Sequence, residues 1–137
     1  MKKAAKEKRP EGIREIEAFG RALVERLAPA RLLACTSTGQ PVLEVASPNG
    51  GQGHSHRAAA HGAELARTCR EAGRRWRAET PASIIMQFAQ AWLLVVHDAE
   101  FALLLELEGA DGGRKKEADR LAEALTTLLT SLHEELL

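Results

Sequence analysis

Apolar residues recur at a helical spacing in three stretches of this chain. The first is Glu11–Leu27, where Pro10 suits the first turn of a helix and Pro29 ends it. The second, Ser55–Arg77, is expected to begin with a serine N-cap. The third starts at about Arg114, after a glycine-rich break, and carries one apolar stripe: Ala118, Leu121, Leu125, Leu128, Leu129, Leu132 and Leu136. The pattern predicts three amphipathic helices.

Shorter apolar runs, bounded by turn residues, predict five strands. Arg31–Thr36 and Pro41–Ser47 flank the polar residues 37–40, an arrangement typical of a hairpin. A long apolar region then divides at its polar interruptions into the strand-length pieces Ser83–Ala89, Trp92–His97 and Phe101–Leu107. The expected order is helix, two strands, helix, three strands, helix, which is that of an α+β domain.

Length and charge indicate one domain without a general affinity for polyanions. A chain of 137 residues can bury its own core, and a formal net charge of zero gives no overall attraction to nucleic acid or anionic membranes. Residues 1–10 are interpreted as a flexible basic arm and 11–137 as the domain. No apolar run approaches a membrane span, and Cys35 and Cys69 lack metal or redox spacing. Free thiols favour a reducing compartment, so we expect the cytoplasm.

The second helix has two different apolar faces. One stripe carries Ala58, Gly62, Leu65, Cys69, Ala72 and Trp76, and we expect it to face the sheet. The opposite side carries Ala59, Ala63 and Ala66, small residues that allow a second backbone to approach closely, which suggests self-association there. The arginines Arg67, Arg70, Arg74 and Arg77 form a basic ridge that could meet a partner. A solvated ridge paired with Glu64 and Glu71 is an equally good interpretation.

The residues that could carry chemistry do not form a convincing site. His54, His56 and His61 lack a carboxylate or thiolate at a matching spacing, so no metal is expected. The glycine-rich loop 109–113 departs from the P-loop pattern. His97 beside Asp98 marks a strand end, and no nucleophile elbow accompanies it. We therefore expect no catalytic residues, no cofactor and no enzyme activity.

Four segments resemble the roadblock/dynein light-chain superfamily over nearly the whole chain from Ile13 onward. They are the hairpin LLACTSTGQPVLEVA, the helix AAAHGAELARTCREAG, the strand block SIIMQFAQAWLLVVHDAEFALLLELE and the Gly-Gly entry to the last helix. Family members usually have a glycine-containing segment between the first helix and the first strand, where this chain has Pro29-Ala30. They also usually have an acidic residue in the first hairpin, where this chain has Thr36-Ser37-Thr38-Gly39. The chain thus resembles a divergent, bacterial MglB-like member or a related profilin-like domain.

The resemblance implies a five-stranded antiparallel sheet with the first and third helices on one face and the second helix on the other. Two copies would pair through the second helix and the following edge strand, using Ala59, Ala63, Ala66, Arg70, Ile84, Met86 and Phe88. An edge as apolar as SIIMQF also needs a cover for physical reasons.

Three functions follow from these observations. MglB-like relatives bind and regulate Ras-like small GTPases, so the resemblance implies a non-catalytic homodimeric regulator or scaffold, with a GTPase-activating or effector role. Arg67, Arg74 and Arg77 are its candidate partner-binding residues. A profilin-, PAS- or GAF-like small-molecule sensor is the alternative, and it would need a polar-lined cavity between the sheet and a helix. A nucleic-acid-binding module ranks third, because aromatic residues for base stacking are scarce.

Overall fold

Every predicted helix and strand is present, in the predicted order. A computed structural model describes residues 11–27, 30–46, 55–79, 81, 83–89, 91–108 and 114–136. The elements are α2 (Glu11–Leu27), β1 (Ala30–Thr36), β2 (Pro41–Ala46), α3 (Ser55–Arg77), β3 (Ser83–Gln87), β4 (Ala91–His97), β5 (Phe101–Glu108) and α4 (Arg114–Leu136). The third predicted strand is shorter than expected and ends at Gln87 instead of Ala89. The predicted basic arm and the loop 109–113 lie outside the described residues.

The five strands form one antiparallel sheet in the order β2-β1-β5-β4-β3. The first strand and the last strand are neighbours at its centre, with Leu33 opposite Leu104. β2 and β3 are left at the two edges. The predicted five-stranded antiparallel sheet is therefore confirmed.

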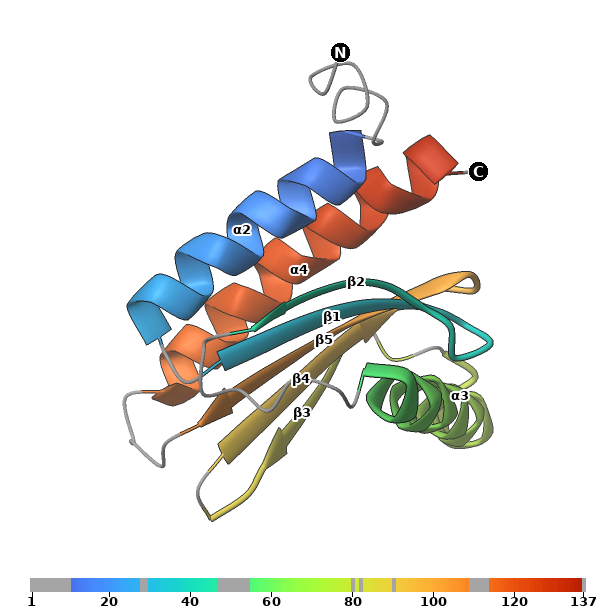
Figure 1. The fold of residues 1–137 in the computed structure, drawn as a ribbon. Coiled ribbons are helices and arrows are strands. Elements are labelled where there is room, and N and C mark those ends of the chain that lie inside the picture. The colour runs from blue at the N-terminus through green and yellow to red at the C-terminus, as the bar shows by residue number, and fades with distance from the viewer. Residues whose placement is uncertain are drawn as a thin grey trace.

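Helices α2 and α4 cover one face of the sheet side by side, and α3 alone lies on the other face (Figure 1). On the two-helix side, Ile16 and Leu23 of α2 and Leu125 and Leu132 of α4 join one buried apolar cluster with the strands. The backbone amide of Gly12 in the first turn of α2 also donates to a carboxylate oxygen of α4, at 2.7 Å. The predicted placement of the three helices is confirmed. Among the described residues, no helix combines the length and apolar character needed to cross a bilayer.

The predicted rotation of α3 about its axis is wrong in part. Ala58, Gly62 and Leu65 of the expected stripe do lie against the sheet, but the alanines expected on the opposite side are buried there as well. Ala59, Ala63 and Ala66, expected to face a partner, are at most 5% exposed, and Ala59 packs against Leu33 and Cys35 of the sheet. Trp76, expected to face the sheet, is 87% exposed. The small residues do allow a second backbone to approach closely, but that backbone belongs to the chain's own sheet.

Gly62 shows how close this approach is. A Cβ atom at that position would lie 2.9 Å from one methyl carbon of Leu104 and closer still to the other. The sheet-facing side of α3 is thus made of Ala59, Gly62, Ala63 and Ala66. The larger apolar residues of the helix are displaced to its flank.

Candidate functional site

Large apolar side chains are exposed on two elements, α3 and β3 with the residue that follows it. Within the described residues, the exposed large hydrophobic residues are Trp76 in the last turn of α3, at 87%, Ile85 in β3, at 38%, and Phe88 after β3, at 50%. Single exposed apolar residues are common, but these three lie on the two elements that the resemblance implies for self-association. We therefore take α3 and β3 as the candidate interaction surface.

The apolar flank of α3 faces the β3 side of the sheet. Ala60, on the other flank, lies against the β1–β2 turn, so close that a Cβ on Gly39 would be 3.0 Å from its Cα. The flank turned the other way carries Ala58, Leu65, Cys69, Ala72 and Trp76. Leu65 packs against the same buried cluster as Ile84 of β3. Leu65 and Ile84 thus lie on the same side of the sheet, and we call the exposed flank of α3 together with β3 the α3/β3 surface.

The edge strand β3 has an unpaired side. In the described part of the chain it pairs with β4 alone, with Ile84 opposite Val95 and Met86 opposite Leu93. Ile84 and Met86 therefore point to the α3 face, and Ile85 points to the α4 face. On the α4 face a groove of about 540 Å³ is lined by Ile85 and by polar residues of α4, among them Asp119 and Glu123.

The predicted interface residues have different positions in the structure. Ile84 and Met86 are half-buried and Phe88 is half-exposed, so these three can still reach a partner. Ala59, Ala63 and Ala66 are buried against the chain's own sheet and cannot. Trp76 and Cys69 share one stripe with Leu65 and were expected to face the sheet, but Trp76 is exposed and Cys69 is half-buried.

The predicted basic ridge is split by the fold. Arg67, Arg74 and Arg77 are exposed, whereas Arg70 is half-buried and turned toward the sheet. Within the described residues, no ion pair joins these arginines to Glu64 or Glu71. The three exposed arginines therefore fit the solvated ridge of the alternative interpretation, but without its pairing to Glu64 and Glu71 among the described residues.

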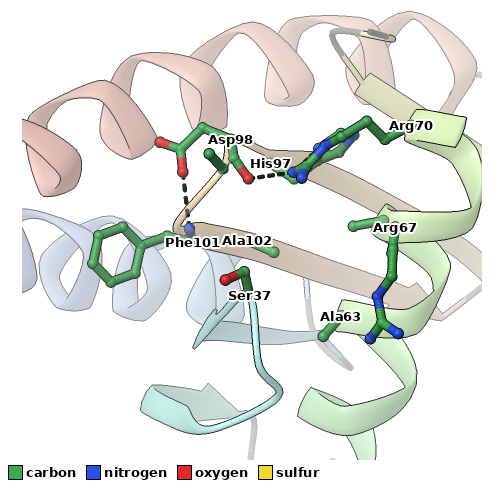
Figure 2. Close-up of a pocket in the computed structure, with 10 residues that line it drawn as sticks. Ser37, Ala63, Arg67, Arg70, His97, Asp98, Phe101 and Ala102 are labelled. Carbon is green, nitrogen blue, oxygen red and sulfur yellow. Dashed lines mark hydrogen bonds between the residues drawn. The ribbon is translucent and has the colours of Figure 1, made fainter. Parts of the chain in front are cut away.

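A small cavity lies between α3 and the turn that joins β4 to β5 (Figure 2). Its volume is about 200 Å³, and its polar lining comes from Ser37, Arg67, Arg70, His97 and Asp98. A guanidinium nitrogen of Arg70 donates to the backbone carbonyl of Asp98 at 2.5 Å and lies 3.5 Å from Nδ1 of His97. A cavity in this place is what the sensor alternative predicted, although it is small for a drug-sized ligand.

The carboxylate of Asp98 is already engaged on the side away from Arg70. One of its oxygens accepts hydrogen bonds from the amides of Glu100 and Phe101, each at 2.8 Å. The other lies 3.1 Å from Nδ1 of His133 in α4. The turn residue Asp98 therefore links α3, through its carbonyl, to α4, through its side chain.

Two buried titratable groups lie at this end of the sheet. Burial lowers the pKa of His97 from 6.5, the cation of Arg70 lowers it further, and Asp98 raises it. Nε2 of His97 is buried and has no hydrogen-bond partner among the described residues. Burial raises the pKa of the Cys35 thiol from 9.0 to about 11, so this cysteine is no nucleophile at neutral pH.

The structure does not gather a metal site in its described part. No group of three or more histidine, cysteine, aspartate or glutamate residues there is arranged to hold a metal ion. His54 lies outside the described residues.

Comparison with solved structures identifies the fold. MglB of Myxococcus xanthus superposes with a TM-score of 0.68 over 88% of this chain and 95% of that chain, at 12% identity. A Roadblock/LC7 domain from Streptomyces avermitilis gives 0.66 over 86% and 94%, at 17% identity. An MglB with a tetrameric arrangement gives 0.68 over 88% and 91%, at 14% identity. No model of a protein family and no curated protein matches the sequence.

Proposed function

We propose that this chain, a roadblock-like domain by fold, is a non-catalytic homodimeric regulator that binds a Ras-like small GTPase in the cytoplasm. The observation that carries the dimer is the exposed α3/β3 surface, where Trp76 and Phe88 are uncovered in the single chain. The GTPase is proposed from the resemblance to MglB-like proteins together with the unpaired arginines of α3.

Self-association through the α3/β3 surface would cover both the exposed apolar flank of α3 and the unpaired edge of β3. Burying a side chain as large as Trp76 contributes about 3 kcal/mol, and the flank around it is apolar. Antiparallel pairing of β3 with its copy would occupy the unpaired backbone groups of the edge and make one continuous sheet. Because the helix flank and the strand edge lie on the same side of the sheet, a twofold axis beside β3 would bring both toward the partner copy.

The dimer is tested by placing a charge on the flank of α3. Trp76→Glu is expected to convert a particle of twice the 14.9 kDa chain mass into a monomer, because it removes an apolar anchor and introduces a charge that pairing would bury. Ala22→Glu is the matched control, since Ala22 is exposed on α2, across the sheet. Sedimentation velocity at several concentrations measures both. A Trp76→Glu protein that stays dimeric would place the contact elsewhere.

The GTPase contact is proposed to use the cationic side of α3. Arg67, Arg74 and Arg77 are exposed and have no ion pair within the described residues, so they can meet acidic groups of a partner without breaking internal bonds. The GTPase would bring the reacting groups, and this chain would bias or position them. No residue of this chain is assigned a chemical step.

Candidate Ras-like GTPases, loaded with GTP or with GDP, provide the test. We expect binding to one nucleotide state to exceed binding to the other, and the triple change Arg67→Gln, Arg74→Gln, Arg77→Gln to weaken it about tenfold or more, by loss of charged contacts. Arg14→Gln is the control, because Arg14 is an exposed arginine of α2. Equal or absent binding across the candidates would leave a scaffold role without the GTPase.

A further inference from the structure

We infer that the cavity between α3 and the β4–β5 turn binds a small oxyanion, of the sulfate, phosphate or carboxylate class. The site combines two arginines, a serine hydroxyl and a buried imidazole around about 200 Å³. Neither the roadblock-like fold nor the proposed GTPase contact requires it. Arg67 belongs to both proposals, but the sulfate test below contains no GTPase, so its outcome is separate from that of the GTPase test.

The first argument is that the two arginines of the cavity have no ion-pair partner among the described residues. Arg67 lines the cavity and has no hydrogen bond or ion pair within the described chain. Arg70 contacts neutral acceptors there, a backbone carbonyl and an imidazole nitrogen. The acid of the lining, Asp98, directs its carboxylate to the amides of its own turn and to His133, as Figure 2 shows in part. Two cations therefore share a cavity in which no described carboxylate forms an ion pair with them.

The second argument is the supply of donors. A guanidinium offers five N–H groups in a planar fork that matches oxyanions, and the contacts of Arg70 described above come from one terminal nitrogen. Ser37 adds a hydroxyl from the β1–β2 turn (Figure 2). His97 lies in the same wall, with its Nδ1 toward Arg70. The guanidinium and hydroxyl groups around the cavity are therefore available as donors to an oxyanion.

The third argument is size and access. A water molecule takes about 30 Å³ of liquid, so a space of this volume has room for a tetrahedral anion with a few waters. Arg67 is exposed, so its side chain can close over an anion that has entered. The lining comes from three separate parts of the chain: α3, the β1–β2 turn and the ends of β4 and β5. An anion there would tie α3 to the sheet.

Sulfate is the probe of choice, because its charge is constant between about pH 5 and 8. The full chain is titrated with sodium sulfate against sodium chloride of equal ionic strength, and backbone amide shifts are followed by NMR. We expect saturable, one-site shifts at Ser37, Ala99 and Ala102. Sulfate at ten times its dissociation constant should also raise Tm by about 5 °C.

Two variants complete the test. Arg67→Gln should weaken sulfate binding about tenfold or more without changing the fold, because Arg67 is exposed and makes no bond to another described residue that the variant would break. Arg75→Gln is the matched control, since Arg75 is exposed on the same helix and does not line the cavity. Shifts that rise linearly and match those in chloride would overturn the inference. So would equal sulfate affinity in Arg67→Gln and the unaltered chain.

Discussion

Replacing Gly62 by alanine tests how closely α3 lies on the sheet. In an open helix this change stabilises, because alanine exceeds glycine in helix propensity by about 1 kcal/mol. Here the new methyl group would lie 2.9 Å from one methyl carbon of Leu104 and closer to the other. Overpacking of this kind costs about 1–3 kcal/mol. We therefore expect Gly62→Ala to lower the free energy of unfolding by about 1 kcal/mol, or Tm by roughly 4 °C.

A second change identifies the cause. Leu104→Ala alone should cost about 3 kcal/mol, because the side chain is only 7% exposed and its loss leaves a cavity. In that background the clash is gone, so Gly62→Ala should now be neutral or stabilising by up to about 1 kcal/mol. The effect of one substitution thus changes sign, and the double-mutant cycle isolates the contact between the two residues.

Urea denaturation followed by circular dichroism measures all four proteins, at several concentrations so that any dimer contribution is visible. Ala22→Gly on the exposed side of α2 supplies the helix-propensity reference, with an expected loss of about 1 kcal/mol. If Gly62→Ala stabilised the unaltered chain by the same amount, the buried side chain of Leu104 would have moved aside without cost, and the argument from overpacking would be refuted.

Three further outcomes are expected. Cys35 should resist a thiol reagent at pH 8 in the folded protein, while half-buried Cys69 reacts. Because burial raises the pKa of Cys35 to about 11, the free energy of unfolding measured in urea should fall as the pH rises from about 9 through that value. Ala78→Gly should raise Tm by a few degrees in calorimetry, because Ala78 ends α3 at a φ of 58°, which costs an alanine roughly 1 kcal/mol. The lowered pKa of His97 means that stability is lost as pH falls below about 6.5, and His97→Gln should remove that part of the slope in urea titrations at pH 5 and 7.

The sequence predicted the candidate site less well than it predicted the fold. The strand Ile84–Met86 was identified as an apolar edge, and it is one. Helical periodicity places Trp76 on the stripe expected to face the sheet, yet it is 87% exposed. The cavity could not be read from spacing, because Ser37, Arg67 and His97 are about thirty residues apart and meet only when α3 packs beside the turns.

The element order was determined by the sequence itself. Hydrophobic period, N-caps and turn residues act over a few positions, so α2, α3 and α4 begin where the local pattern places them. The rotation of α3 about its axis was decided by tertiary structure alone. A helical wheel offers two apolar faces here, and the choice between them depends on the shape of the opposing sheet. The methyl groups of Leu104 occupy the space that a side chain at position 62 would need, so the small residues Ala59, Gly62 and Ala63 pack inward and Trp76 is left exposed.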